Sequence, residues 1–144
     1  MAADIFIDTN VLLYSVSTSE DEVGKRATAR QVLAGPGWGL SVQVLQEFYV
    51  NVVRPPRCAI THAAVAAIHQ LLRRPTVATD AVLVLEGLRL KERYQISYWD
   101  AAIVAAARAL GARVLYSEAL NHGQDYDGVR VVNPFLPHWP ARPP

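Results

Sequence analysis

Acidic side chains at the ends of predicted strands are the residues of this sequence best suited to chemistry. Asp8 directly follows a short hydrophobic segment and precedes an apolar helix that begins near Val11. In an open α/β sheet, ligands bind beyond the carboxyl ends of the strands, so an acid at this position faces a crevice. The segment Asp8-Thr9-Asn10 also suits a helix N-cap, and capping alone is the alternative interpretation.

Two further acids interrupt the apolar faces of predicted helices. Asp100 lies four residues after Ile96 and three before Ile103, on a face expected to be buried. Glu47 interrupts an apolar stripe beside Phe48. A carboxylate on such a face is costly unless it is paired, hydrogen-bonded or bound to metal. The alternatives are a dipole-favoured position in the first helical turn for Asp100 and simple solvation for Glu47.

These acids together favour a divalent cation. Glu118 follows a second hydrophobic segment, much as Asp8 follows the first. Carboxylates in one crevice repel one another, and a cation is the natural counter-charge because the basic residues lie elsewhere in the sequence. One cysteine and four scattered histidines argue against zinc, whereas oxygen ligands suit Mg²⁺ or Mn²⁺. In such sites the metal activates water and holds a phosphodiester.

The elements that must position these acids alternate along the chain, which favours an α/β fold with a mostly parallel sheet. We expect strands at residues 5–8, 38–41, 76–78, 113–116 and 129–132, and helices at residues 11–16, 21–33, 41–53, 61–74, 79–93 and 97–110. Residues 121–128 are expected to form a polar loop. Residues 1–136 would form one domain, followed by a proline-rich tail at residues 137–144.

Composition limits the classes of function. The chain has 144 residues, 51% of them hydrophobic, and a formal net charge of +1, so overall charge gives no case for nucleic-acid binding. A single cysteine, Cys58, allows no internal disulfide and fits a reducing cytoplasm. We see no signal peptide and no run of about 18 apolar residues that would span a membrane.

An ordered set of motifs resembles the PIN-domain nucleases, and most closely the VapC-type toxins of bacterial toxin–antitoxin systems. The matching segments are residues 8–12, 41–49, 97–107, 115–118 and 131–135. The resemblance implies an α/β/α sandwich with a central, mostly parallel sheet and Mg²⁺- or Mn²⁺-dependent cleavage of RNA. Carried over by position, Asp8, Glu47 and Asp100 would be the catalytic, metal-binding acids. Supporting roles in orienting carboxylates and water would fall to Thr9, Asn10, Ser97 and Ser117.

The chain departs from the family pattern at one position. The fourth family acid corresponds to Ala119, in the segment Ser117-Glu118-Ala119. Glu118 could replace it as a metal ligand, or Asp125 or Asp127 could reach in from the loop. We favour a third interpretation, in which the position is vacant, cleavage is weakened, and the fold and partner binding are kept. The alternative function is therefore an inactive PIN fold that binds RNA or antitoxin.

Partners follow from the same resemblance. It implies an RNA substrate, a cognate antitoxin that covers the acidic crevice, and a homodimer. Basic pairs at helix ends are candidate RNA-phosphate contacts, with helix-dipole capping as the alternative: Arg54, Arg57, Arg73 and Arg74. The small-residue helix near residues 61–68 is a candidate dimer seam, with ordinary core packing as the alternative.

Overall fold

The computed structural model describes residues 2–137 and 139–140. Within this range, six strands form one sheet in the order β3-β2-β1-β4-β6-β5, and only β5 runs antiparallel to its neighbour. The strands are β1 (Ile5–Ile7), β2 (Trp38–Ser41), β3 (Thr76–Val77), β4 (Val114–Tyr116), β5 (Asp125–Tyr126) and β6 (Val129–Val132). The prediction of a mostly parallel sheet is confirmed.

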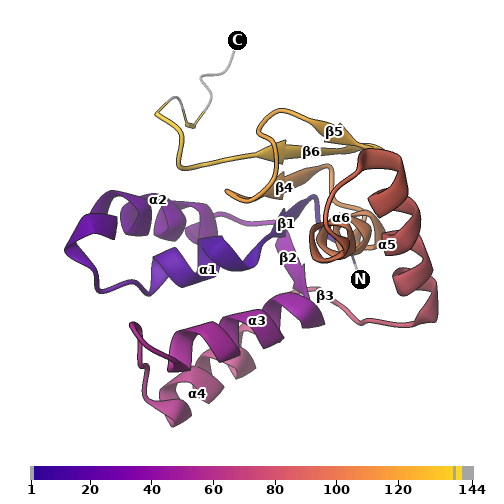
Figure 1. The fold of residues 1–144 in the computed structure, drawn as a ribbon. Helices are drawn as coiled ribbons and strands as arrows, with labels where there is room; N and C mark the ends of the chain where they lie inside the picture. The colour runs from indigo at the N-terminus through magenta and orange to yellow at the C-terminus, as the bar shows by residue number, and fades with distance from the viewer. Residues whose placement is uncertain (1, 138, 141–144) are drawn as a thin grey trace.

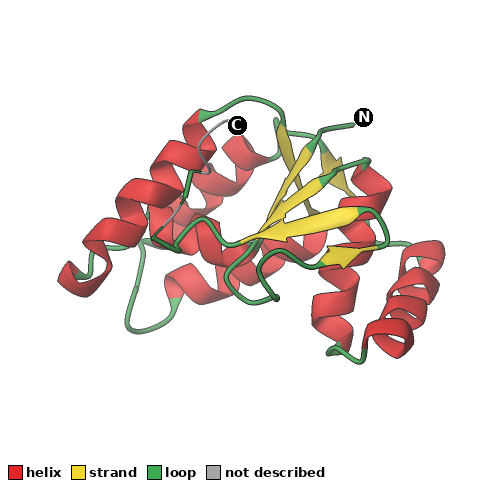
Figure 2. Cartoon of the chain, turned by 90° about the horizontal axis from the view of Figure 1, so that it is seen from above, coloured by secondary structure: helices red, strands yellow, loops and turns green. Residues whose placement is uncertain are grey.

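Helices cover both sides of this sheet (Figures 1 and 2). They are α1 (Thr9–Ser15), α2 (Val23–Ala34), α3 (Val42–Val53), α4 (Thr61–Leu71), α5 (Ala81–Tyr94) and α6 (Tyr98–Leu110), with a short 3₁₀ turn, η1 (Glu20–Glu22), before α2. Figure 1 shows α5 and α6 on the opposite side of the sheet from α1 and α2. The α/β/α sandwich expected from the sequence is therefore present.

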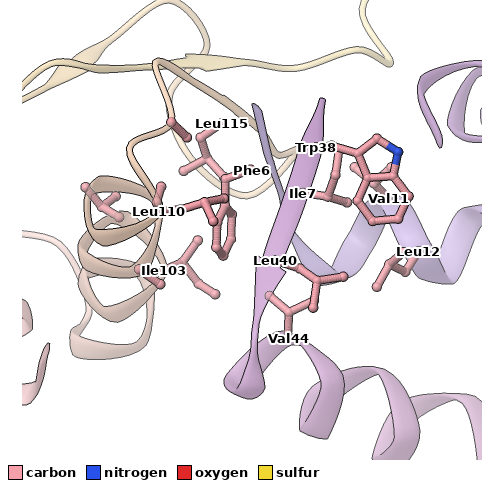
Figure 3. Close-up of a cluster of buried hydrophobic side chains, with 14 of the residues drawn as sticks. Phe6, Ile7, Val11, Leu12, Trp38, Leu40, Val44, Ile103, Leu110 and Leu115 are labelled. Atoms are coloured by element: carbon pink, nitrogen blue, oxygen red, sulfur yellow. The ribbon is translucent and has the colours of Figure 1, made fainter. Parts of the chain in front are cut away.

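The central strand β1 is buried on both faces, because successive side chains of a strand point to opposite sides. Phe6 lies with Ile103 and Leu110 toward α6, whereas Ile7 lies with Val11 toward α1 (Figure 3). All five side chains are at most 3% exposed. With both faces covered by helices, the carboxyl edge of the sheet is the place where polar side chains can gather.

Close packing on β2 depends on a glycine. A Cβ atom at Gly39 would lie 2.6 Å from the carbonyl oxygen of Pro75 and 2.9 Å from Cδ2 of Leu110. Since real Cβ atoms do not approach backbone oxygens so closely, only glycine lets β3 and α6 pack against β2 at this point.

One sequence-based expectation is wrong in part. The predicted polar loop at residues 121–128 contains β5, whose Tyr126 is fully buried and packs edge-on against Tyr94 with ring centroids 4.9 Å apart. The strand turns back into β6 through Asp127 and Gly128, which have φ values of +50° and +100°. An Asp-Gly pair is a strong hairpin signal, but two residues of strand are too few to show an alternating pattern.

Other boundaries shift by a few residues. The helix expected at residues 61–74 ends at Leu71, before Pro75. Of the predicted tail, Trp139 packs edge-on against Tyr116 with ring centroids 6.2 Å apart. Residues 138 and 141–144 lie outside the described residues, so the domain boundary at residue 136 stays a prediction. Among the described helices, none combines the length and apolar character that a bilayer crossing requires.

Candidate acidic metal site

Asp8, at the carboxyl edge of the sheet, is acted on by the charges of two other acids, Glu47 and Asp100. Asp8 immediately follows β1, and Glu47 lies in α3, which follows β2 directly. Asp100 lies in the first turn of α6. The negative charges of Glu47 and Asp100 both raise the pKa of Asp8, which places the three carboxylates within electrostatic reach. Two of the acids singled out in the sequence, Glu47 and Asp100, thus act electrostatically on the third, Asp8.

Asp8 is the buried member of the set, with 6% of its surface exposed. Its Oδ1 accepts a 2.7 Å hydrogen bond from the Thr9 N–H and so caps α1, as the alternative interpretation expected. Its Oδ2 accepts a 2.7 Å hydrogen bond from the Ser117 hydroxyl. Burial raises the pKa of Asp8 to about 6, against the opposing effect of these two hydrogen bonds. Capping and a role in the acidic site are therefore compatible.

Glu47 is half-buried and held by neutral donors. Its Oε2 accepts a 2.6 Å hydrogen bond from the Thr9 hydroxyl, and its Oε1 accepts a 2.9 Å bond from Nε2 of Gln43. Thr9 thus donates to both acids, through its N–H to Asp8 and through its hydroxyl to Glu47. Sequence reasoning missed Gln43, although its position one helical turn before Glu47 could have indicated the contact.

Asp100 is half-buried, with its carboxylate left unpaired. The Ser97 hydroxyl caps α6 by accepting a 3.1 Å hydrogen bond from the Asp100 N–H. Within the described residues, the Asp100 carboxylate has neither a hydrogen bond nor an ion pair. Its neighbours Ala101 and Ile103 are buried, so the acid stands at the edge of the apolar face rather than beneath it.

Asn10 and Ser117 connect the site to the end of β4. Asn10 Nδ2 donates to the Ser117 hydroxyl over 3.4 Å, and Asn10 Oδ1 accepts from the Glu118 N–H at 3.2 Å. The Ala119 N–H donates to the same hydroxyl at 3.0 Å. Ser117 is fully buried, so this network fixes the hydroxyl that contacts Asp8.

Glu118 has other partners. Its Oε2 forms a 2.7 Å ion pair with Nζ of Lys25, and its Oε1 accepts a 2.6 Å bond from the Tyr14 hydroxyl. Burial acts in the opposite direction, but these bonds lower the pKa of Glu118. Glu118 is not among the charges that act on Asp8. Neither Lys25 nor Tyr14 carried a signal in the sequence, since their link to Glu118 spans about two thirds of the chain.

The two acids expected in the loop, Asp125 and Asp127, form ion pairs with arginines instead. Asp127 pairs with Arg89 at 2.8 Å and Arg93 at 2.9 Å, while Asp125 lies 3.9 Å from Arg130. Neither acts on the pKa of Asp8. Ala119 is exposed, so the position that corresponds to the fourth family acid faces solvent without an acidic side chain.

The predicted RNA-contacting arginines fall into two places. Arg54 follows α3, is exposed, and donates a 2.5 Å bond to Oδ1 of Asn51, while Arg57 is half-buried nearby. Arg73 and Arg74 border a cavity of about 440 Å³ that also includes Trp38. The Arg74 guanidinium stacks over the Trp38 ring at 4.0 Å. Among the described residues, none of these four arginines forms an ion pair with Asp8, Glu47 or Asp100. Their role in RNA binding therefore stays a prediction.

The donor chemistry at this edge fits a hard divalent cation. Three carboxylates lie at this edge, and no basic side chain contributes to the pKa of Asp8. Oxygen donors with uncompensated negative charge are the ligands that Mg²⁺ and Mn²⁺ prefer. Within the described residues, however, no three acid, histidine or cysteine side chains are gathered tightly enough to hold an ion as they stand.

A parallel sheet with acids at its carboxyl edge is an arrangement suited to ligand binding, and comparison of the sequence with known families identifies the class of protein. The sequence profile of the PIN domain matches residues 5–119, which is most of the chain. The chain therefore belongs to the PIN domain family. No curated protein sequence matches it.

Solved structures share this fold. VapC20 from Mycobacterium tuberculosis, described as a toxin that cleaves the sarcin–ricin loop, is 23% identical with a TM-score of 0.63 over 78% of this chain and 88% of that one. A toxin–antitoxin complex from Klebsiella pneumoniae is 20% identical with a TM-score of 0.65, over 90% of this chain and 96% of that one. VapBC2 from Rickettsia felis, bound to promoter DNA, is 14% identical with a TM-score of 0.62, over 88% of this chain and 96% of that one.

Proposed function

We propose that the chain is a Mg²⁺- or Mn²⁺-dependent endoribonuclease and the toxin of a toxin–antitoxin pair. The observation that carries this proposal is the buried Asp8 carboxylate. The charged groups that raise its pKa are two further acids, Glu47 and Asp100. A protein keeps such an arrangement at a cost in stability, so a functional counter-charge is the natural explanation. Membership of the PIN domain family supports the nuclease class.

In this proposal Asp8, Glu47 and Asp100 hold the cation. When bound, the metal would supply charge neutralisation at the phosphodiester and make water a better nucleophile. The chain's own polar groups orient the acids: Ser117 and the Thr9 N–H fix the two oxygens of Asp8, and the Thr9 hydroxyl fixes Glu47. Such supporting hydrogen bonds preserve the carboxylate positions before substrate binds.

The remaining residues take lesser roles. Asn10 holds Ser117, and Ser97 caps the helix that carries Asp100. Arg54, Arg57, Arg73 and Arg74 remain proposed contacts to RNA phosphates, which would position substrate without reading its sequence. We leave Glu118 out of the metal-binding set, because Lys25 already neutralises it.

Because Ala119 stands where the family has its fourth acid, we propose that the chain cleaves RNA only weakly. Lacking the fourth acid, the site would hold a second cation poorly, if at all. Restoring the acid with Ala119→Asp should increase metal-dependent cleavage. An inactive PIN fold that binds RNA or antitoxin is the competing function, and it predicts no cleavage by this chain even in excess Mg²⁺ or Mn²⁺.

The proposed partners are an antitoxin and a second copy of the chain. Several structural neighbours are toxin–antitoxin complexes. Apolar side chains on α5 are strongly exposed and offer a surface for self-association, namely Val82 at 74%, Leu85 at 66% and Leu88 at 48%. Activity on RNA would place the protein in the cytoplasm.

The test is cleavage of a fluorogenic RNA in EDTA, Mg²⁺ and Mn²⁺ by the wild type and by the Asp8→Asn and Asp100→Asn variants. Cleavage should require metal and fall by about 10²-fold or more in both variants. Asp125→Asn is the matched control, because it removes an exposed acid outside the site. RNA binding without metal-dependent cleavage by the wild type would favour the inactive fold.

A further inference from the structure

A cavity of about 540 Å³ opens beside the acidic site, between the starts of α3 and α6 and the residues that lead into α5. Its lining includes Trp99, which directly precedes Asp100, and Gln43, which contacts Glu47. A cavity of this size falls in the usual range for sites that bind small molecules. None of the roles assigned above uses it.

One wall of the cavity is aromatic. Trp99 exposes 65% of its surface, although large aromatic side chains are normally mostly buried. Tyr98 packs against it edge-on, with ring centroids 5.2 Å apart. Tyr98 in turn lies close to α5 at Gly87, where a Cβ atom would be 3.3 Å from Cε1 of the ring. Tyr98 therefore braces Trp99 and leaves an indole face open to a ligand.

The other side of the cavity offers polar groups. Gln43 Nε2 lies 3.4 Å from the Trp99 carbonyl oxygen as well as 2.9 Å from Glu47, so it joins the cavity to both acid-bearing helices. Gln46 and Thr79 also line the cavity. Within the described part of the chain, neither of their side chains has a hydrogen-bond partner. They supply donors and acceptors at an aromatic wall.

We infer that this cavity is a nucleobase subsite, in which an unstacked base of single-stranded RNA next to the cleaved phosphate stacks on Trp99 and hydrogen-bonds to Gln46 and Thr79. Proteins bind single-stranded RNA by stacking splayed bases on aromatic side chains and contacting their edges with polar groups. An apolar partner surface would leave the amide and hydroxyl groups buried without partners. The inference rests on the proposed function, since it takes the acidic site as the place of cleavage.

The test measures binding of a labelled single-stranded RNA of about eight nucleotides by fluorescence anisotropy in EDTA, so that cleavage does not contribute. A second oligonucleotide lacks one base at an internal position. Trp99→Leu removes the stacking face and Trp99→Tyr keeps one. Val23→Ala is the matched control, because it removes an exposed apolar side chain on α2 that does not line the cavity. The oligomeric mass of each variant is measured in parallel.

We expect Trp99→Leu to weaken binding of the intact RNA about 10-fold, while Trp99→Tyr and Val23→Ala stay near the wild type. Loss of the base should weaken binding to the wild type but not to Trp99→Leu. Equal RNA binding by Trp99→Leu and wild type would overturn the inference. If that variant also lost mass as the oligomer dissociated, the face would belong to a second copy. Metal-dependent cleavage that persists in either case would leave the proposed function standing.

Discussion

The Ser117 hydroxyl donates a 2.7 Å hydrogen bond to Oδ2 of Asp8, although 109 positions separate the two residues in the chain. The pairing of β1 with β4 brings them together, since Asp8 and Ser117 each directly follow their strand. The bond opposes burial in setting the pKa of Asp8. It therefore favours the ionised form that a cation requires.

Ser117→Ala should destabilise the protein and impair the acid. Because the lost bond is buried and involves a carboxylate, the free energy of unfolding should fall by about 1–3 kcal/mol at neutral pH. The pKa of Asp8 should rise further, because Ser117 lowers it. Urea unfolding measures the first effect and the NMR titration of the carboxyl carbon the second. Thr18→Ala, which removes an exposed hydroxyl, is the control; a variant as stable as this control would contradict the prediction.

Asp8→Asn should gain stability relative to the metal-free wild type as pH rises from about 4 to about 6. The pKa of Asp8 is 3.8 in ordinary surroundings and about 6 in the fold, so the folded state holds the proton more tightly. Below about pH 4 the acid is protonated in both states and costs nothing; the cost grows as pH rises and is complete above about pH 6. The shift corresponds to at most about 3 kcal/mol.

Unfolding of both proteins in EDTA across pH 4–8 measures this difference. Asparagine keeps the capping oxygen of α1 but replaces the oxygen that accepts from Ser117 with an amide nitrogen. That lost bond shifts the stability of the variant at every pH, so the change of the difference with pH reports the charge. The stability of the variant relative to the wild type should rise between about pH 4 and about pH 6 and then level off. Curves that stay parallel would contradict the buried, uncompensated charge.

The sequence predicted much of the site because strand ends and helix faces are local patterns. Asp8 and Asp100 were recognisable from the hydrophobic residues around them, and the fold brings them within electrostatic reach. The partners of Glu118 were not predictable, because Lys25 reaches it only through the packing of α2 near the end of β4. Periodicity gives the direction of a side chain along its own element, whereas the partner across elements depends on the packed fold.

Glu118→Gln should leave Mn²⁺ binding unchanged. The Glu118 carboxylate is occupied by Lys25 and Tyr14, so its charge is not needed by a cation beside Asp8. Because this ion pair is partly exposed, stability should fall by no more than about 1 kcal/mol. Titration calorimetry with Mn²⁺ and urea unfolding test the two statements. A clear loss of Mn²⁺ affinity would return Glu118 to the metal-binding set.

Asp127→Asn should weaken the docking of β5 on α5. Hydrogen bonds from Tyr94 and Arg89 lower the pKa of Asp127 to about 2, so the charged form is favoured in the fold. That contribution is present above the ordinary pKa of 3.8 and disappears as pH falls toward 2. The loss at neutral pH should be about 1–2 kcal/mol and should shrink in high salt.

Asparagine suits the backbone at this position, where φ is +50°, so the change removes charge without adding strain. Thermal unfolding at pH 7 and pH 3, in low and high salt, measures the effect. A melting temperature equal to that of the wild type at pH 7 in low salt would contradict a stabilising role for the ion pairs of Asp127.

Mn²⁺ titration calorimetry at pH 7.5 tests most directly whether Asp8, Glu47 and Asp100 form a cation site. The wild type should bind Mn²⁺, and the doubly substituted Asp8→Asn, Asp100→Asn protein should not. Thermal unfolding without metal would establish that the variant is folded. Binding of equal strength by both proteins would place the metal elsewhere, and an absence of binding by the wild type would contradict the claim outright.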